Sequence, residues 1–491
     1  MFFWKEKERY MAKRNEQFVS FIADQSQDFP QWYTDVIRLS EMVDYGPVKG
    51  TMVIRPYGYG VWELIQRELD QRIKDTGHQN AYFPLFIPES FLMKEAEHVE
   101  GFAPEVAWVT QGGNEVLPER LVVRPTSETI ICSMYSKWVQ SWRDLPVMIN
   151  QWANVVRWEK TTRPFLRTSE FLWQEGHTVH ATAEEAQEET LRMLEVYREF
   201  SENVLAIPMV TGRKTEKEKF AGAAATYSIE ALMQDGKALQ AGTSHNLGQH
   251  FSKAFNIQFQ NKEGQLEYGY QTSWGATTRL IGALVMVHGD QRGLVLPPRV
   301  APIQVVILPI AAHKGGVMEV CQRVADTLQG AGIRVKLDDR DSVSPGFKFN
   351  EWELKGVPLR LEIGPKDIEK GMALAMRRDT LEKLPLPLED IGEQALRLLD
   401  EIHLGMLHKA QAYLSAHTYD CTNLEEMGER LDHGKGYVRA MWCGDRACED
   451  AIKEKFSATA RNMPFDQTPV GETCVCCGRP AKHLVFWARA Y

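Results

Sequence analysis

The chain lacks a long apolar run. Its longest apolar stretch, 280–287, has eight residues, whereas a helix that crosses a bilayer needs about 20. Residues 1–9 alternate aromatic residues with Lys and Glu and lack the apolar core of a secretory signal. We therefore expect a cytoplasmic protein without membrane partners. The segment from Met11 to Lys13 looks like a second start, so we expect the first ten residues to be dispensable, and whether Met1 or Met11 is the true start stays open.

The chain also lacks an excess of positive charge and any compositional bias. A net charge of −9 excludes a generally basic, sequence-blind nucleic-acid binder, and we expect no DNA partner. A local basic stripe would still suffice for RNA. The hydrophobic fraction of 44% and charged fraction of 25% are those of a folded globular protein rather than a disordered one. A chain of 491 residues should hold two or three domains.

Cysteine is sparse, with eight residues, and in the cytoplasm these are thiols or metal ligands rather than disulfides. Three of them stand alone in the sequence and are best explained as small buried side chains: Cys132, Cys321 and Cys421. The other five gather in two groups near the C-terminus: Cys443 and Cys448, then Cys474, Cys476 and Cys477. Two close pairs separated by a loop are typical of a tetrahedral zinc site.

A zinc site needs four of these five thiols. We expect Cys443, Cys448, Cys474 and Cys477 to be the ligands, with Cys476 spare, although whether Cys476 replaces Cys477 stays open. Redox chemistry is the alternative explanation for the group. An all-thiolate set leaves no position for water, so the predicted zinc is structural.

Hydrophobic patterning predicts a first domain of antiparallel α+β type, residues 1–288. Its expected helices are 61–76, 127–142 and one opened by the capping box Thr182-x-x-Glu185, and its expected strands are 81–87, 147–151, 154–158 and 171–179. Proline cannot donate to a strand ladder, so Pro84 places the strand 81–87 at an edge or interface.

Beyond a Gly- and Pro-containing linker, 289–298, strand and helix alternate as in a small α/β domain. The expected elements are strands 304–310, 334–337 and 360–363 and a helix at 317–329. We assign residues 289–388 to this second domain and 389–491 to a third α+β domain that is helix-rich at first and ends in the cysteine group.

Three short segments point to one chemistry: 124–128 (Arg-Pro-Thr-Ser-Glu), 157–168 (from Arg-Trp-Glu to Arg-Thr) and 275–279 (Gly-Ala-Thr-Thr-Arg). A carboxylate can hold an ammonium group, and fixed arginines can hold phosphates and a carboxylate. A lone arginine is usually solvated surface, but three arginines in three separate motifs are poorly explained that way. Together these groups favour the joining of an amino acid to a nucleotide.

These segments resemble the motifs of class II aminoacyl-tRNA synthetases, and in particular the prolyl-tRNA synthetase family of the archaeal and eukaryotic-like type, over almost the whole chain. The resemblance implies a catalytic domain, an anticodon-binding domain and a C-terminal zinc domain. It implies a ligase that attaches L-proline to tRNA(Pro) in two steps with ATP and Mg²⁺, through a prolyl-adenylate. It also implies a homodimer, with the Pro84 strand as motif 1.

The resemblance assigns roles by motif. Arg157 and Arg279 would be catalytic, since guanidinium groups relieve the negative charge that gathers at phosphorus. The proline site would comprise Thr126, Glu128, Arg157, Trp173, Glu175, His177, Phe220, His245 and Ser273. The ATP site would comprise Arg157, Glu159, Arg167, Thr168, Phe171, Gln240, Thr243 and Arg279, with Gln240 and Thr243 beside ATP and its Mg²⁺. We expect Glu159 to lie two residues after Arg157 on the same strand and to face the same side.

Particular residues distinguish this chain from related synthetase families. The threonyl family carries a zinc-binding cysteine in the element that corresponds to 126–128, and this chain has none there. About a hundred residues separate the second motif from the third, which leaves no space for a large editing insertion. An inactive synthetase paralogue and a zinc ribbon that binds nucleic acid remain as alternative functions. The anticodon readers are not identified, and the candidates are Lys348, Glu351, Arg360 and Lys366.

Overall fold

The computed structural model describes residues 22–93 and 106–491. A mixed sheet runs through the first and last parts of the chain, in the strand order β20-β21-β23-β22-β9-β10-β11-β14-β8-β7-β3. The α+β class expected from the sequence is confirmed. None of the helices in these ranges is long and apolar enough to cross a membrane.

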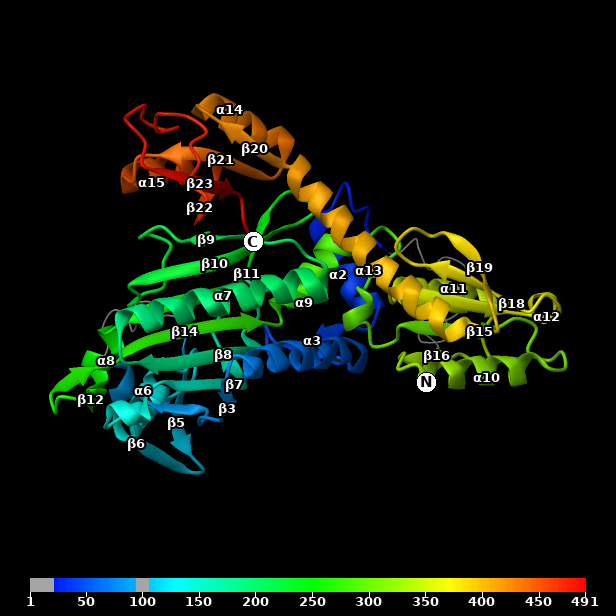
Figure 1. Ribbon diagram of the computed structural model, residues 1–491, viewed down its shortest axis with the longest axis horizontal. Helices are drawn as coiled ribbons and strands as arrows, with labels where there is room; N and C mark the ends of the chain where they lie inside the picture. The colour runs from blue at the N-terminus through cyan, green and yellow to red at the C-terminus, as the bar shows by residue number, and fades with distance from the viewer. Residues whose placement is uncertain (1–21, 94–105) are drawn as a thin grey trace.

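The catalytic-type unit is built on the antiparallel strands β7 to β11 and β14. Their bounds are β7 Val147–Val156, β8 Glu170–His180, β9 Val210–Arg213, β10 Ala225–Leu232, β11 Ala238–Gly248 and β14 Tyr270–Thr277. Helix α7 (Ala183–Leu205) crosses one face of this sheet beside α3 (Pro56–Asp75), and α9 (Arg279–His288) follows β14 (Figure 1). Apolar side chains of these helices and of α2 (Phe29–Leu39) form the largest buried core.

Local sequence signals explain several of these elements. The predicted capping box opens α7, because Thr182 accepts a hydrogen bond from the Glu185 backbone and Glu185 accepts one from Thr182. A close approach of Trp274 requires Gly176 on β8, since a Cβ there would lie 2.0 Å from the indole ring. Gly77 ends the expected first helix with φ of 92°.

Four element predictions were wrong in extent, the first being the helix expected at 61–76, which begins at Pro56. The two strands expected at 147–151 and 154–158 are the single strand β7, which ends before Arg157. The helix expected at 127–142 is α6 (Glu128–Trp138), followed by the short η3 (Trp142–Asp144). Of the strand expected at 81–87, only Phe86 and Ile87 lie in a strand, β4 (Phe86–Pro88), because Pro84 lacks a backbone donor; the short β3 (Gln79–Asn80) precedes the expected range.

β4 pairs with β6 (Glu115–Val123), which pairs with β5 (Ala107–Gly112). Helices α4 (Glu89–Leu92) and α8 (His250–Phe255) and the hairpin of β12 (Gln258–Gln260) and β13 (Leu266–Tyr268) complete this region, and β1 (Val43–Tyr45) pairs with β2 (Met52–Ile54). Large apolar side chains remain exposed here, among them Tyr82, Phe86 and Trp108.

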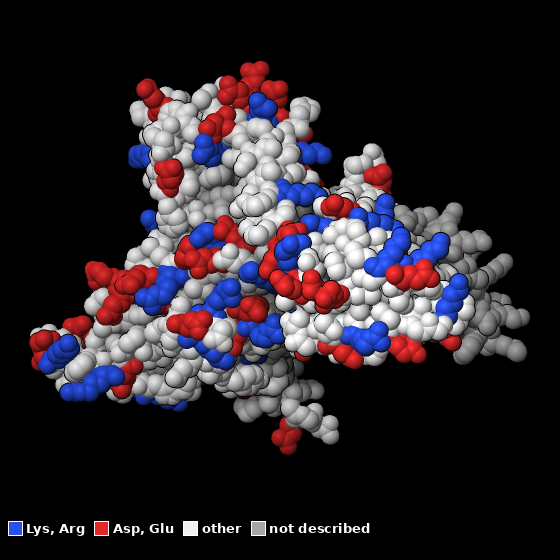
Figure 2. All heavy atoms as spheres, turned by 45° about the vertical axis from the view of Figure 1, so that its right-hand side comes forward, with Lys and Arg blue, Asp and Glu red and all other residues white. Residues whose placement is uncertain are grey.

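The second unit has the predicted α/β pattern, with strand order β16-β15-β17-β18-β19. Its strands are β15 Val305–Pro309, β16 Val335–Leu337, β17 Leu359–Ile363, β18 Met372–Arg377 and β19 Lys383–Pro387, and its helices are α10 Val317–Gly330, α11 Pro345–Leu354 and α12 Pro365–Glu369. The η4 turn (Pro298–Val300) precedes it. On the face shown in Figure 2, Lys and Arg are interspersed with Asp and Glu over this unit and the junction beside it.

Helix α13 (Ile391–Ala416) runs along all three parts of the molecule (Figure 1). Its first half packs into the core of the second unit through Ile391 and Leu398. Its middle packs on Ala206 and Val295, and its end lies beside the strands of the C-terminal unit. The predicted boundary at residue 389 therefore lies two residues before a helix that contacts all three units.

The C-terminal unit, residues 418–491, extends the sheet of the first unit. It contains β20 (Thr418–Cys421), α14 (Leu424–Glu429), η5 (Arg430–Gly434), β21 (Tyr437–Trp442), α15 (Arg446–Phe456), β22 (Thr459–Pro464) and β23 (His483–Ala488). β22 pairs with β9 of the first unit, with Met463 opposite Arg213. The backbone ladder thus joins the two units directly.

Candidate active site

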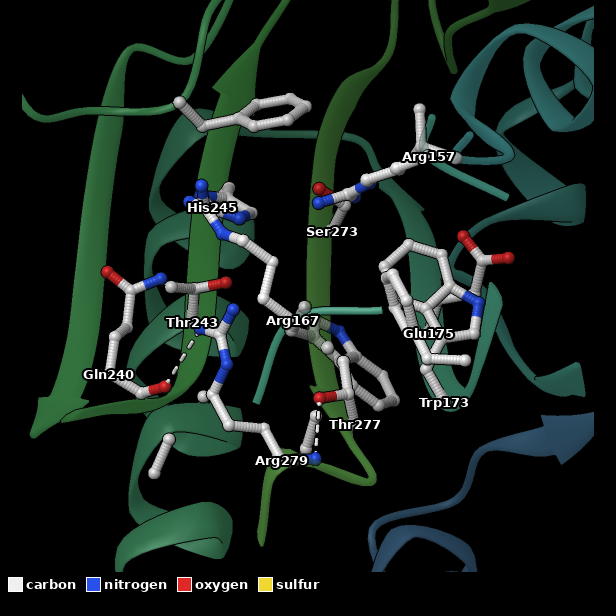
Figure 3. A pocket seen from close by; sticks show the side chains of 18 of the residues that line it. Arg157, Arg167, Trp173, Glu175, Gln240, Thr243, His245, Ser273, Thr277 and Arg279 are labelled. Carbon is white, nitrogen blue, oxygen red and sulfur yellow. Dashed lines mark hydrogen bonds between the residues drawn. The ribbon is translucent and has the colours of Figure 1, made fainter. Parts of the chain in front are cut away.

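One cavity of ≈310 Å³ lies on the sheet face opposite α7. All of the residues that the sequence assigned to substrates line it: Thr126, Glu128, Arg157, Glu159, Arg167, Thr168, Phe171, Trp173, Glu175, His177, Phe220, Gln240, Thr243, His245, Ser273 and Arg279. Figure 3 shows side chains from the separate segments converging on this space. The structure therefore brings the whole predicted set together.

Strand register explains how residues far apart in sequence meet. One row across the sheet contains Thr226, His245, Ser273 and His177 as successive cross-strand partners. The next row toward the arginines contains Thr243, Gly275, Glu175 and Gln151. Because alternate residues of a strand face the same side, Trp173, Glu175 and His177 of β8 face the cavity together, whereas Gln174 hydrogen bonds to Tyr197 of α7.

The acidic end of the cavity lies at the start of α6. Thr126 donates a hydrogen bond to the carboxylate of Glu128, and both side chains are buried. Glu128 is the first residue of α6, where the positive end of the helix dipole favours a carboxylate. A buried carboxylate with a hydroxyl beside it suits an ammonium group.

Behind this pair, a hydrogen-bonded network fixes Glu175. Its Oε1 accepts from Gln151 Nε2 at 2.6 Å and from the hydroxyl of Ser127, and its Oε2 lies 2.9 Å from His177 Nε2. Burial on its own raises the pKa of Glu175, but its partners, His177 first, lower it overall. Sequence reasoning missed Gln151 as part of the site, because only the β7–β8 register reveals it.

The apolar wall is built around His245. The ring of Phe220 lies 4.6 Å from the imidazole, and a hydrogen bond of 3.0 Å joins His245 Nδ1 to Thr226 Oγ1. Burial, and then the charge of His177, lowers the pKa of His245 to about 3. His245 is therefore neutral near neutral pH and contributes a flat, uncharged surface. Thr226 and Glu218 line the cavity as well and were not foreseen.

The basic end of the cavity is lined by Arg167 and Arg279. Arg279 begins α9, with Nε donating to the Leu166 carbonyl at 3.1 Å and Nη1 to the Gln240 carbonyl at 3.2 Å. Burial, and then the charges of Arg157 and Arg167, lowers the pKa of Arg279 to about 10. Arg279 therefore remains cationic at neutral pH, and two arginine side chains make this end of the cavity attractive to a polyanion.

Arg157 lies between the two ends. Its Nε donates to the Pro125 carbonyl at 3.1 Å, and its guanidinium lies 5.5 Å from the ring of Phe171 and 5.7 Å from that of Trp173. These contacts hold the guanidinium above the cavity (Figure 3). A group fixed between an ammonium site and a polyanion site can contact both substrates.

Glu159 differs from its prediction. Arg157 and Glu159 both follow the end of β7 in a loop instead of lying on one strand, and the Glu159 N–H donates to the Arg157 carbonyl at 2.7 Å. This tight turn still directs the carboxylate to the cavity, 3.5 Å from Arg167 Nη1.

Two buried polar atoms at the cavity, Ser273 Oγ and Trp173 Nε1, have no hydrogen-bond partner among the residues that the structure describes. An unsatisfied buried donor costs about 1–3 kcal/mol. Such atoms are typical of positions where a ligand supplies the partner.

The four cysteines expected as ligands form a second candidate centre. Cys443, Cys448, Cys474 and Cys477 place their sulfur atoms within 4.8 Å of one another, and Cys476 lies outside this group. The Cys443 sulfur is 3.7 Å from that of Cys448 and 3.8 Å from that of Cys477. Tetrahedral zinc with bonds of about 2.3 Å requires sulfur separations of roughly 3.8 Å, so the cysteine cluster fits zinc.

The candidate anticodon residues are placed less favourably. Lys348 and Arg360 are buried, with Lys348 Nζ donating to the Asp338 carbonyl at 2.9 Å and Arg360 paired with Glu362 at 3.0 Å. Glu351 pairs with Arg340 at 2.6 Å. Lys366 is exposed on α12. Internal partners thus occupy three of the four side chains.

Family models match three segments of the chain. The tRNA synthetase class II core domain (G, H, P, S and T) matches residues 113–288, the anticodon binding domain matches 304–397, and the prolyl-tRNA synthetase C-terminal domain matches 424–491. No editing domain is among these models.

Curated relatives match along their full length. Proline--tRNA ligase of Acetoanaerobium sticklandii is 62% identical over 481 residues, which is 98% of this chain and 100% of the relative. Proline--tRNA ligase 2 of Clostridioides difficile is 60% identical with the same coverage. The crystal structure of prolyl-tRNA synthetase from Cryptosporidium parvum, complexed with halofuginone and AMPPNP, superposes with a TM-score of 0.93 at 44% identity and covers 96% of this chain and 100% of that one.

Proposed function

We propose, because the chain belongs to the prolyl-tRNA synthetase family, that it attaches L-proline to tRNA(Pro) in two ATP-dependent steps. The observation that carries this proposal is the separation of charge inside one cavity. Glu128 and Glu175 lie at one end, Arg167 and Arg279 at the other, and Arg157 between them. A zwitterionic amino acid and a nucleoside triphosphate fit this arrangement in one orientation, with the ammonium group at the acidic end and the phosphates at the basic end.

In the first step, a carboxylate oxygen of proline attacks the α-phosphorus of ATP and pyrophosphate leaves. Thr126 and Glu128 would accept the two N–H bonds of the pyrrolidinium, which fixes the amino acid. Trp173, Phe220 and His245 would surround the apolar ring.

The arginines would stabilise the negative charge that gathers in this step. Arg157 would bridge the α-phosphate and the proline carboxylate, and Arg279 would hold the γ-phosphate, without a general base. Glu159, Arg167, Thr168 and Phe171 would hold the rest of the nucleotide. Gln240 and Thr243 would lie beside ATP and its Mg²⁺, and that cation, when bound, neutralises phosphate charge.

In the second step, the 3′-hydroxyl of the terminal adenosine of tRNA attacks the carbonyl of the adenylate, and AMP leaves. The products are the prolyl ester and AMP. Residues 168–274, all described, fold into β8, α7, β9 to β11, α8 and the β12–β13 hairpin of the catalytic-type unit. The proposed enzyme therefore works without a cis editing insertion.

An ATP–pyrophosphate exchange assay with single amino acids tests the function. We expect exchange that depends on proline and exceeds that with other amino acids. An inactive paralogue, or a protein whose only role is nucleic-acid binding through the cysteine cluster, gives no proline-dependent exchange. That result would overturn the proposal.

Structural zinc, dimerisation and location complete the proposal. The cysteine cluster would hold one Zn²⁺ per chain, and Arg479, whose Nε lies 3.2 Å from the Cys477 sulfur, would balance thiolate charge.

Tyr82 and Phe86, exposed beside Pro84, support a two-fold dimer interface that light scattering would detect. We place the enzyme in the cytoplasm, with its substrates, and divide it at residues 288 and 388 into catalytic, anticodon-binding and zinc domains.

A further inference from the structure

A loop segment, residues 214–222, connects the C-terminal unit with the cavity. On its cavity side, Glu218 and Phe220 are part of the lining. The Phe220 N–H donates to Thr226 Oγ1 at 3.0 Å, and the same oxygen is 3.0 Å from His245 Nδ1. The position of the loop segment therefore sets the position of the apolar wall.

On its other side, the loop segment is bound by α15. Thr215 Oγ1 donates to Glu449 Oε1 at 3.0 Å, and the two residues are only 1% and 2% exposed. Lys217 Nζ lies 2.7 Å from the carboxylate of Asp450. The first contact is buried, whereas Asp450 is half exposed, so the Thr215–Glu449 bond should carry most of the restraint.

The start of the loop segment is anchored as well. Lys214 Nζ donates to the Arg461 carbonyl of β22 at 2.6 Å and lies 2.6 Å from Glu230 Oε1, and Arg461 pairs with the other oxygen of Glu230 at 2.9 Å. This buried cluster fixes the junction of β9 with β22. From Lys214 onward, Thr215 and Lys217 direct the chain along α15.

The cysteine cluster determines where these α15 side chains lie. Glu449 follows Cys448 directly, and both belong to the first turns of α15. Asp445 caps that helix by accepting from the Ala447 N–H at 3.0 Å, and it pairs with Arg479 at 2.7 Å. The cysteine cluster, α15 and the loop segment thus form a continuous chain of contacts that ends at Phe220.

We propose that Glu449 is a positioning residue for the amino-acid pocket: by holding Thr215, it fixes the loop segment and with it Phe220 and His245. The inference rests on the proposed function and deepens it, because it gives the C-terminal unit a part in proline binding. Loss of the contact should weaken proline binding and leave ATP binding unchanged, because none of the residues assigned to ATP belongs to the loop segment.

Kinetics of matched variants test this role. We expect Glu449→Ala and Thr215→Val each to raise the KM for proline about tenfold, the size of effect for one lost buried hydrogen bond. The KM for ATP should stay within about twofold. Glu449→Gln keeps an acceptor for the Thr215 hydroxyl and should restore most of the affinity. Glu454→Ala, an exposed change on the same helix, is the control and should behave as wild type.

Limited trypsin digestion gives a readout that does not depend on activity. Trypsin cuts after Lys217 and Lys219 in the loop segment, and we expect faster cutting there in Glu449→Ala and Thr215→Val than in wild type and Glu454→Ala. Zinc content is measured in each sample. Faster cutting with wild-type zinc supports the proposal, because the metal centre is then intact.

Two results would overturn the inference: unchanged cutting and unchanged KM for proline in both variants, or equal increases in the KM for proline and for ATP. Both results leave the proposed function standing if wild type shows proline-dependent exchange. Absence of that exchange in wild type contradicts the function instead, while the digestion still tests whether Glu449 holds the loop segment.

Discussion

His177 and Glu175 form a buried pair on the same face of β8, with His177 Nε2 2.9 Å from Glu175 Oε2. Burial on its own lowers the pKa of His177, but the hydrogen bond and charge of Glu175 raise it overall. The pKa of Glu175 is lowered. The two groups are therefore both charged between these two pKa values.

This pair predicts a pH dependence of stability. A raised histidine pKa contributes stability that is complete below the unfolded-state pKa and is lost as the pH rises through the folded-state pKa. We expect the free energy of unfolding to fall on the alkaline side by about 1.4 kcal/mol for each unit by which the pKa is raised. Glu175 adds a loss at acid pH, as the pH falls through its lowered pKa.

Urea unfolding over a pH series checks this prediction. In His177→Gln the alkaline loss should be absent, because glutamine does not titrate. His245→Gln is the control: the pKa of His245 is about 3, so its replacement should leave the alkaline slope unchanged. An unaltered slope in His177→Gln would contradict the assignment.

Arg157→Ala should abolish most adenylate formation while the fold stays intact. The change removes a guanidinium fixed between the two ends of the cavity, and the exchange rate should fall by about 100-fold or more. Arg323→Ala, an exposed change on α10, is the matched control. Near-normal proline-dependent exchange in Arg157→Ala would contradict the catalytic role proposed for this arginine.

Glu128→Gln should raise the KM for proline far more than the KM for ATP. A charged hydrogen bond to the ammonium becomes a neutral one, and charged bonds contribute about 1.5–3 kcal/mol against roughly 1 for neutral ones. Steady-state exchange kinetics with each substrate varied separately measure the difference. Equal changes in both constants would move Glu128 out of the amino-acid site.

The sequence predicted which residues line the cavity better than it predicted their geometry. Motifs identified Thr126, Arg157 and Arg279 because each needs a particular residue type at a fixed spacing. The role of Gln151 depends on strand register, which links residues 24 apart, and no local pattern carries that information. Glu159 was misplaced because β7 ends at Val156, and strand ends are set by tertiary packing.

The fold was predicted in the same uneven way. The capping box located the start of α7, and the sequence pattern located α10, whose two ends nearly match expectation. The strand expected around Pro84 was too long, because a pattern of apolar residues does not show that proline lacks a backbone N–H donor. The pairing of β22 with β9 joins residues about 250 apart, and nothing local in either strand indicates its partner.

The proposed enzyme should mischarge tRNA(Pro) with alanine or cysteine at a measurable rate. A rigid apolar pocket rejects a smaller side chain only weakly, by about 1–3 kcal/mol, and the described segment 168–274 contains no added editing unit. Aminoacylation with radiolabelled alanine and cysteine measures the error. If the purified enzyme alone hydrolyses alanyl-tRNA(Pro), the inference of absent proofreading is wrong.

The C-terminal tail packs against the catalytic-type unit at the start of β11. Ala238 accepts a hydrogen bond from the Tyr491 N–H at 3.1 Å and donates one to the Arg489 carbonyl at 2.8 Å. The Tyr491 hydroxyl donates to Asp235 at 2.7 Å. Two residues after Ala238, Gln240 lines the cavity, so the tail braces a strand that contributes to the proposed nucleotide site.

Deletion of residues 490–491 should therefore lower exchange activity without releasing zinc, because the cysteine cluster lies outside this contact. We expect a larger effect on the KM for ATP than on that for proline, since our proposal places Gln240 and Thr243 beside ATP. Tyr491→Phe removes only the hydroxyl and should lie between wild type and the truncation. Metal analysis should give one zinc per chain in all three proteins, because folded thiolate ligands bind the metal far more tightly than the unfolded chain does. Full activity after truncation, or zinc lost together with the tail, would contradict this account of the C-terminus.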